Sequence, residues 1–480
     1  MTAEGADRAF LSARRIAALV REREVSPVEI TRLYLERIER LDARLRAYIT
    51  VVPEAALETA RRAETAVMRG APLGPLHGVP YAVKDQFDTA GVRTTSGSRI
   101  LEDHVPTEDA TTISRLNAAG GILLGKLNLT EFALGGTQQF PFGQPRNPWN
   151  LDHDPGGSSS GSGIAVAAGL CAASLGEDTG GSVRSPASFC GVVGLRPTWS
   201  RVSRHGSFPL SWSMDTPGPL ARTVEDTAWL LQAIAGYDAK DPLSSRAPVP
   251  EYARTLGDGV RGLRIGIVRE LTFGPETDAE VREAVIGAAR CLERLGAVTE
   301  EVSLPLVPFA GAVFMALADS DGAGVHHRWL RTRAGDYDQG TRRRLLTASL
   351  IPAAIPAAGR AGSSAPARRD ARGARAPRSA LVPDRAPGGP TDRRRPRRHH
   401  RPPRGRRAFL HATLLRHARR AGRAAGHRLA VRLHGVRPPA QPPADRAPLR
   451  GGHGASRGAC VRARVRMVAA PSARNHLIGD

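Results

Sequence analysis

The chain changes composition sharply near residue 350, and this change limits how much of it can build a hydrophobic core. Residues 351–480 contain 30 Arg, no Lys, 5 Asp and no Glu, and Ala, Arg, Gly and Pro make up 88 of these 130 residues. Their single aromatic residue is Phe409. A segment with so few large apolar side chains and so high a net charge buries too little surface to offset the entropy of folding. We therefore expect one folded domain in residues 1–355 and a tail, residues 356–480, that is not a folded domain.

This tail has two explanations. Ala, Arg, Gly and Pro are the amino acids whose codons can be written with G and C alone, so the first explanation is a GC-rich gene read out of frame after about residue 355. The second is a genuine basic tail, because residues 351–480 carry a net charge of +25 while residues 1–350 hold 39 basic and 41 acidic side chains. Such a tail could bind nucleic acid through its phosphates, although it lacks the aromatic residues of a stacking surface.

Targeting and metal-binding signals are missing from the sequence. The N-terminus lacks a charged-then-apolar leader, and no apolar run reaches the roughly 18 residues of a membrane span, so we expect a cytoplasmic protein without a membrane partner. The four cysteines show no CxxC spacing and no neighbouring His pair. We therefore expect neither a disulfide scaffold nor a metal site, and no cofactor.

Apolar periodicity and turn residues predict alternating helices and strands. Ser26 and Pro27 begin a helix with a capping motif, because Glu29 follows three residues after Ser26. Further helices are expected at 54–69, 111–119, 163–173 and 280–295, and strands at 78–83, 122–125 and 263–268. This alternation is the pattern of an α/β protein.

Two Gly- and Ser-rich segments fall within this α/β region. They are GGSSSGSG at 156–163 and GEDTGGSVRSP at 176–186, and serine is a poor nucleophile unless a base removes its proton. GSSSG within the first segment matches the GxSxG elbow of α/β-hydrolases, but the residues before it are typical of a loop rather than of the required strand. None of the six His in residues 1–350 lies in a recognisable nucleophile motif.

Lysine is the alternative base, and it is scarce here. The whole chain has three Lys against 66 Arg, and Lys84 stands at the end of an apolar segment. Arginine stays protonated, whereas burial can lower the pKa of a lysine from about 10.4 toward neutrality. Lys84 is therefore the candidate base. The competing interpretation is a structural ion pair between Lys84 and neighbouring Asp85.

Three segments together resemble the amidase signature family. They are GVPYAVKDQFDTAGVRTTSGS, DPGGSSSGSGIAVAAG and GEDTGGSVRSPASFCGVVGLRP, and the resemblance continues to about residue 355. It implies a central, mixed, mostly parallel β-sheet covered by helices on both faces. It also implies a Ser-Ser-Lys triad with Ser182 as nucleophile, Lys84 as base and Ser158 as the bridging serine. The peptide bond between Gly157 and Ser158 is cis in this pattern.

The resemblance implies supporting roles for further residues. Backbone N–H groups of the serine loop would form the oxyanion hole, which stabilises negative charge on the substrate oxygen. They would come from Thr179, Gly180, Gly181 and Ser182. Asp178 and Arg184 would hold that loop, unless they are an ordinary turn residue and a surface arginine. Thr137 and Ser159 would border the substrate, unless they are ordinary polar residues of their loops.

The chain departs from the family at two places. Ser160 stands where glycine is common, and a serine there would be strained if the position requires a positive φ. From about residue 357 onward nothing resembles the further strands of the family. The expected consequence is an incomplete catalytic domain with an exposed sheet edge, which opposes folding and activity of this chain.

The activity that the resemblance implies is that of an amidase, which hydrolyses a linear carboxamide through an acyl-enzyme. We expect a small-molecule amide as substrate and no nucleic-acid partner. A homodimer is the assembly considered for the chain. The alternative within the family is the A subunit of glutamyl-tRNA(Gln) or aspartyl-tRNA(Asn) amidotransferase, which needs partner subunits and an ammonia tunnel. GGTQQFPFGQ and FPLSWSMDTPGP look more like the stand-alone amidases, which favours the first activity.

Overall fold

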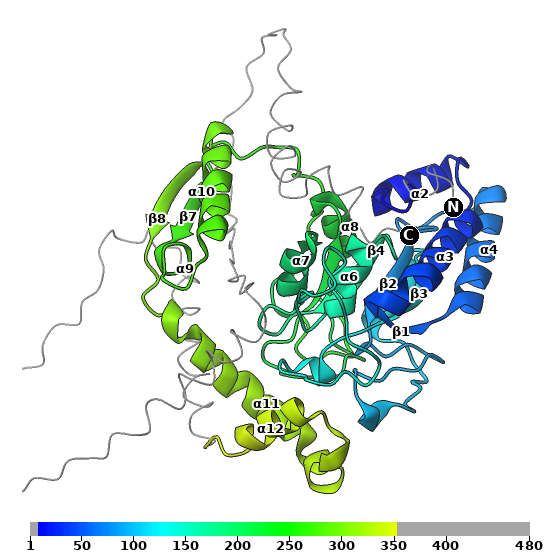
Figure 1. The fold of residues 1–480 in the computed structure, drawn as a ribbon. Coiled ribbons are helices and arrows are strands. Elements are labelled where there is room, and N and C mark those ends of the chain that lie inside the picture. Colours follow the sequence, from blue (N-terminus) through cyan, green and yellow to red (C-terminus); the bar gives the residue numbers. More distant parts are fainter. Residues whose placement is uncertain (1–7, 353–480) are drawn as a thin grey trace, which may run out of the picture. The chain divides into compact units, whose positions relative to one another are not determined.

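The structure is a computed structural model of the 480-residue chain, and it describes residues 8–352 (Figure 1). Residues 8–351 belong to one compact unit. The expectations for residues 356–480 lie outside the described residues. The α/β class expected from the sequence is confirmed.

Helices make up most of the regular structure. The α-helices are α2 (Ala13–Arg21), α3 (Pro27–Leu45), α4 (Pro53–Met68), α5 (Thr111–Ala118), α6 (Ser160–Ala167), α7 (Arg184–Cys190), α8 (Val224–Ile234), α9 (Arg269–Thr272), α10 (Ala279–Arg294), α11 (Ala310–Thr332) and α12 (Gln339–Ala348). Short 3-10 helices are η1 (Arg99–Leu101), η2 (Glu131–Ala133), η3 (Val307–Phe309) and η4 (Ala334–Asp336). The strands are β1 (Tyr48–Val51), β2 (Pro80–Lys84), β3 (Ile122–Leu127), β4 (Ala173–Glu177), β5 (Val193–Gly194), β6 (Pro217–Ala221), β7 (Arg264–Val268) and β8 (Val298–Val302).

Six strands form one mixed sheet with the order β1-β3-β2-β4-β6-β5. The pairs β2-β3 and β2-β4 are parallel, whereas β1-β3, β4-β6 and β5-β6 are antiparallel. The mixed sheet is thus confirmed, and its parallel part is limited to the three central strands. Antiparallel strands commonly flank a parallel centre in such sheets.

Helices pack on this sheet from two sides (Figure 1). Helices α3 and α4 contact β3, while α6 contacts all of β2, β3, β4 and β6, and α8 contacts β6. All residues of β2 and β4 are buried, as coverage on both faces requires. The expected helices on both faces are therefore confirmed.

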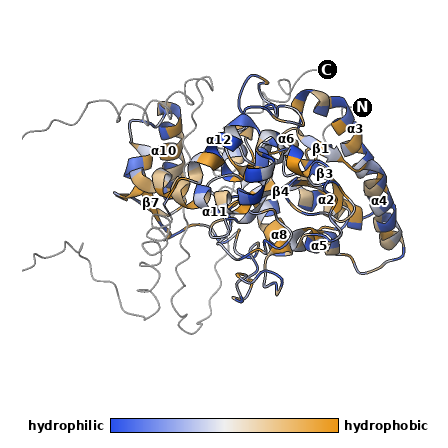
Figure 2. Cartoon of the chain, turned by 90° about the horizontal axis from the view of Figure 1, so that it is seen from below, coloured by the Kyte–Doolittle hydropathy of each residue, from blue (hydrophilic) through white to orange (hydrophobic). Residues whose placement is uncertain are grey.

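The first long helices follow the predicted caps and periodicity. Helix α3 begins after Ser26, whose Oγ accepts hydrogen bonds from Val28 N at 3.0 Å and Glu29 N at 3.2 Å. Helix α4 has both hydrophilic and hydrophobic positions along its length (Figure 2). Its buried stripe consists of Ala56, Ala60, Ala63 and Val67. Recurrence every three to four residues turns this stripe toward the core.

One predicted helix is shorter than expected. The small-residue pattern predicts a helix over 163–173, but α6 ends at Ala167 and β4 already begins at Ala173. Gly169 lies between them with a φ of +64°, a left-handed conformation that commonly follows a helix end. Residues in both elements are buried throughout, so apolar periodicity could not locate the boundary.

A second, two-stranded parallel sheet is formed by β7 and β8. Helix α10 contacts β8, and α9 contacts β7. The 23-residue helix α11 follows and contacts α12. Within residues 8–352, no helix combines the length and the apolar character needed to cross a membrane.

Candidate active site

Lys84 is the last residue of β2, and its side chain is fully buried. Its Nζ donates a hydrogen bond to Ser158 Oγ at 2.8 Å. Burial lowers the pKa of Lys84, and the charge of Glu177 opposes this shift. A neutral lysine in this setting can accept a proton from the hydroxyl. The predicted base and the predicted bridging serine are therefore in direct contact.

The competing ion pair between Lys84 and Asp85 is not formed. Asp85 Oδ1 lies 3.4 Å from Lys126 Nζ instead. Successive residues of a strand point to opposite faces, so Lys84 and Asp85 meet different neighbours. Lys126 Nζ also donates to Phe87 O at 2.5 Å and Thr94 Oγ1 at 2.6 Å. Lys126 is thus held by structural contacts, whereas Lys84 faces a serine hydroxyl.

The serine loops meet beside Lys84. The peptide bond between Gly157 and Ser158 is cis, as the resemblance implies. Ser182 is half-buried in the loop between β4 and α7, and its carbonyl oxygen accepts a hydrogen bond from Ser159 N at 3.2 Å. Within residues 8–352, no hydrogen bond links the hydroxyls of Ser158 and Ser182. Catalytic hydrogen bonds are often long without substrate, so the relay between these hydroxyls stays a prediction.

A buried carboxylate organises the loop of the candidate nucleophile. Asp178 accepts hydrogen bonds from Gly181 N at 2.7 Å and Val183 N at 3.1 Å. Arg184 binds its two oxygens at 3.0 Å each, and Arg196 Nη1 binds Oδ1 at 3.0 Å. Burial alone raises the pKa of Asp178, but the hydrogen bonds and charge of Arg184, with Arg196, hold it below its usual value. Arg196 was not singled out from the sequence; its only signal was its place in the GLRP segment.

The predicted oxyanion donors differ in their surroundings. Gly181 has a φ of +127°, which favours glycine, and its N–H is engaged by Asp178. A Cβ on Gly180 would overlap the half-buried ring of Phe314 in α11. Nothing in a helical sequence pattern indicates contact with a loop 134 residues away, so Phe314 was not predicted. The oxyanion roles of Thr179, Gly180, Gly181 and Ser182 stay predictions.

The two residues expected to border the substrate make contacts within the protein. Ser159 is fully buried; its Oγ donates to Glu177 O at 3.3 Å and accepts from Glu177 N at 3.4 Å. Thr137 Oγ1 accepts a hydrogen bond from Glu131 N at 2.9 Å. Both side chains thus fasten their loops, and their contact with substrate stays a prediction.

Ser160 is compatible with the loop despite the departure from the family. It is the first residue of α6 and is not among the residues with positive φ. Its Oγ donates a hydrogen bond to Gly156 O at 2.7 Å. The condition for strain at Ser160 is therefore not met.

Two buried carboxyl groups near Lys84 were not predicted. Glu177 is the last residue of β4, and its Oε2 lies 3.6 Å from Lys84 Nζ. Thr179 Oγ1 lies 3.1 Å from Glu177 Oε1 and 2.7 Å from Asp215 Oδ1. Burial and the charge of Glu177 raise the pKa of Asp215 to about 8. The sequence offered one signal for Glu177. It follows the uncharged segment ASLG, just as Lys84 follows the uncharged segment PYAV.

The arrangement can support nucleophilic catalysis by a serine. A desolvated amine contacts one hydroxyl, and a second serine lies on the adjoining loop beside backbone N–H groups. Among the described residues, no group of three or more His, Cys, Asp and Glu could hold a metal ion.

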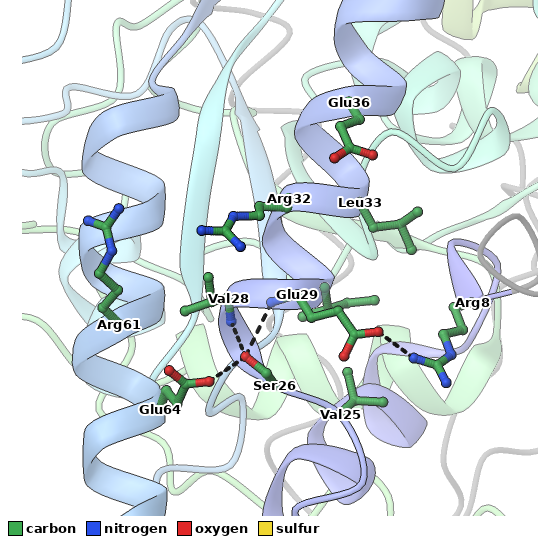
Figure 3. A pocket seen from close by; sticks show the side chains of 11 residues that line it. Arg8, Val25, Ser26, Val28, Glu29, Arg32, Leu33, Glu36, Arg61 and Glu64 are labelled. Carbon is green, nitrogen blue, oxygen red and sulfur yellow. Dashed lines mark hydrogen bonds and ion pairs between the residues drawn. The ribbon is translucent and has the colours of Figure 1, made fainter. Parts of the chain in front are cut away.

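A separate groove lies between α3 and α4 and has a volume of about 770 Å³ (Figure 3). Two pairs of its polar and charged residues are in contact: Ser26 Oγ donates to Glu64 Oε1 at 2.5 Å, and Arg8 binds Glu29 at 2.5 Å. None of the site residues predicted from the sequence lines this groove.

Known proteins resemble this chain over its first three quarters. The sequence profile of the family described as Amidase matches residues 29–355. The A subunit of glutamyl-tRNA(Gln) amidotransferase from Carboxydothermus hydrogenoformans is 44% identical over 330 residues, which are 68% of this chain and 68% of that protein. The chain spans about two thirds of the length of the curated relatives it matches.

Solved structures with this fold include both activities considered above. The peptide amidase of Stenotrophomonas maltophilia has a TM-score of 0.67 and 34% identity, covering 73% of this chain and 78% of that one. The A subunit of glutamyl-tRNA(Gln) amidotransferase from Thermotoga maritima has a TM-score of 0.62 and 34% identity, covering 76% of this chain and 75% of that one. Similarity of fold therefore does not separate the two activities.

The curated relatives correct the expected partners. A small-molecule amide without nucleic acid, and a homodimer, were expected, but the names of these relatives refer to tRNA and to one subunit of an amidotransferase. The segments GGTQQFPFGQ and FPLSWSMDTPGP, which favoured a stand-alone amidase, are two short stretches, whereas the match to such a relative extends over 330 residues. With the Amidase profile matching residues 29–355 and 44% identity over 330 residues to such a relative, the chain belongs to the amidase signature family.

Proposed function

We propose that the chain is the A subunit of a glutamyl-tRNA(Gln) amidotransferase and releases ammonia from a carboxamide. The identity to a relative with that name over 330 residues supports the assignment. The 2.8 Å hydrogen bond between the buried Lys84 Nζ and Ser158 Oγ is the observation that supports the chemistry. Lys84 acts as base, Ser158 as bridge and Ser182 as nucleophile.

The reaction begins at the hydroxyl of Ser182. Its oxygen attacks the amide carbonyl carbon while its proton passes to Ser158, and the proton of Ser158 passes to Lys84. Negative charge develops on the carbonyl oxygen, where backbone N–H groups of the serine loop stabilise it. The C–N bond breaks as the proton returns through Ser158 to the leaving nitrogen. Water then hydrolyses the acyl ester and frees Ser182.

The test measures ammonia release and amide transfer separately. The full-length chain is incubated with glutamine alone, and then with glutamyl-tRNA(Gln) and the remaining amidotransferase subunits of Carboxydothermus hydrogenoformans. We expect glutaminyl-tRNA(Gln) only in the complete mixture, and its loss in a Ser182→Ala variant. Ammonia release from simple amides that is independent of the added subunits, with no transfer to tRNA, would identify a stand-alone hydrolase instead.

A further inference from the structure

Glu177 is a buried acidic residue beside the candidate base to which the proposed reaction assigns no role. Its side chain is fully buried, and its Oε2 has no hydrogen-bond partner among the described residues. That oxygen lies 3.6 Å from Lys84 Nζ. A buried carboxylate is costly unless it is paired with a cation. The cation in reach is the ammonium of Lys84.

The sheet itself places the two residues together. β2 and β4 are parallel neighbours, with Val83 paired to Leu175. Lys84 and Glu177 are the last residues of these strands, so both lie at the same edge of the sheet. The contact is therefore built into the strand register and does not depend on a mobile loop.

Thr179 links the two buried carboxyl groups, Glu177 and Asp215. Its Oγ1 lies within hydrogen-bond distance of both Glu177 Oε1 and Asp215 Oδ1, at 3.1 and 2.7 Å. A hydroxyl has one proton to donate, so one of the two carboxyl groups has to supply its own. Burial and the charge of Glu177 raise the pKa of Asp215 to about 8. Of these two carboxyl groups, Glu177 is the one that the structure places beside an amine, with Oε2 3.6 Å from Lys84 Nζ, and we assign the negative charge of the pair to it on this contact.

Two further acidic groups near Lys84, Asp178 and Asp85, have cationic partners. Asp178 is paired with Arg184 and Arg196 at 3.0 Å each. Asp85 faces Lys126 on the other side of β2. The remaining polar neighbours are hydroxyls and backbone groups: Ser158 Oγ at 2.8 Å and Glu177 O at 3.5 Å. Glu177 is thus the counter-charge in contact with Lys84.

We propose that Glu177 is a positioning residue for Lys84, whose carboxylate stabilises the ammonium formed when Lys84 takes the proton passed on from Ser182. The C–O bond forms at Ser182, the proton travels through Ser158 to Lys84, and it returns by the same path to the leaving nitrogen. Glu177 neither gains nor loses a proton. The buried aspartate of a Ser-His-Asp triad stabilises its imidazolium in the same way. This inference rests on the proposed function, because it requires Lys84 to be the base.

The test compares pH profiles of ammonia release from glutamine by the complete enzyme, with wild-type chain or with Glu177→Gln. An opposite charge within about 4–6 Å raises the pKa of a lysine by about 1–3 units, so its removal should move the acid limb of kcat/KM to lower pH by about that amount. The plateau of kcat should fall by up to about tenfold for each such unit, since the ammonium loses that stabilisation. KM should change little, because Glu177 does not touch the substrate.

Asp85→Asn is the matched control. It removes a carboxylate that is equally buried and lies beside the other buried lysine, Lys126. We expect a lower melting temperature and an acid limb that stays in place. Glu177→Asp keeps the charge but withdraws it from Lys84, so its acid limb should lie between those of the wild type and Glu177→Gln.

The outcomes separate the inference from the function on which it rests. An unmoved acid limb in Glu177→Gln, together with an inactive Lys84→Ala variant, overturns the role of Glu177 alone. Undiminished activity in Lys84→Ala overturns the triad and the inference with it. If Glu177→Gln fails to fold, Glu177→Asp decides, and an acid limb identical to the wild type overturns the proposal.

Discussion

At the scale of single residues, the scarcity of lysine pointed to positions that arginine cannot fill. Lys84 and Lys126 are fully buried, whereas Lys240 lies on the surface and binds Glu108. A guanidinium stays charged wherever it is placed, while a buried amine can release its proton. Composition thus indicated the candidate base, and the contact with Ser158 distinguishes it from Lys126.

Replacing Lys84 with Met removes the amine and keeps most of its volume. We expect kcat for ammonia release to fall by about 10²–10⁴-fold, because the proton of Ser158 loses its acceptor. The melting temperature should fall as well, because the carboxyl group of Glu177 loses the amine that lies 3.6 Å away. Lys126→Met serves as the control, since it removes the bonds to Phe87 and Thr94 and should reduce stability more than activity. Equal loss of activity in both variants would contradict a special role for Lys84.

Replacing Asp178 with Asn leaves Arg184 and Arg196 without their shared carboxylate. Breaking a buried ion pair by removing one partner costs about 3–5 kcal/mol, and partial exposure of both arginines places the expected loss at or below that range. The pKa of Asp178 is lowered in the fold, so the wild type should lose this stabilisation as the pH falls through that pKa, while Asp178→Asn should not. Urea unfolding at neutral and acidic pH measures both effects. Parallel pH curves for the two proteins would rule out this contribution of Asp178.

At the scale of elements, helix α11 brings residues from the second half of the described chain into contact with the serine loop of the candidate active site. Its residue Asp321 accepts a hydrogen bond from Ser211 Oγ at 2.6 Å, and Phe314 lies against Gly180. His326 in the same helix is buried among aromatic rings and contacts Tyr337 Oη at 2.9 Å. The helix therefore both covers the serine loop and fills a small aromatic core.

A double-mutant cycle tests the contact between α11 and the serine loop. Gly180→Ala places a methyl group into the Phe314 ring and should destabilise the protein by about 1–3 kcal/mol. Phe314→Ala in the same chain should remove most of that penalty, which gives a coupling energy of about 1 kcal/mol or more. Unfolding free energies of the four proteins provide the values. Additive effects would show that the two residues do not meet.

His326 should make stability depend on pH. Burial lowers its pKa to about 4, so it stays neutral in the fold while the unfolded chain takes up a proton below about pH 6.5. The unfolding free energy should therefore be highest above pH 6.5 and fall by about 3 kcal/mol as the pH decreases to 4. Chemical unfolding across this range should show a flatter curve for His326→Gln. An unchanged slope in that variant would exclude His326 as the cause.

At the scale of the whole molecule, composition predicts where the folded part ends. All 30 Arg of residues 351–480 fall after residue 355, and the first is Arg360. We propose that residues 1–355 form the domain, and we expect brief trypsin treatment to leave a fragment that ends near Arg360 and contains Lys84, Ser158 and Ser182. Intact mass identifies the fragment. Equally rapid cleavage within residues 8–350 would contradict this boundary.

The α/β class and most element positions could be predicted from local sequence, whereas the contact of Lys84 with Ser158 was expected from the resemblance to the amidase signature family. Apolar periodicity reveals an element within a short window, as in α3 and β2, and Gly-Ser motifs are recognised by residue identity alone. The end of α6 could not be predicted, because a run of uniformly buried small residues has no periodicity to read. The partners were predicted wrongly, because the prediction chose between a stand-alone amidase and an amidotransferase subunit on the basis of two short segments.

Apolar periodicity along the chain was enough to identify the class of fold, the scarcity of lysine pointed to the candidate base, and the resemblance to the amidase signature family pointed to the two serines. Strand order and helix docking alone decided what surrounds them: Glu177 beside Lys84, Arg196 on Asp178 and Phe314 over Gly180. The reason is physical. Periodicity and motifs are properties of neighbouring residues, whereas these contacts join residues 18 to 134 positions apart and exist only after the sheet has formed and α11 lies against the serine loop.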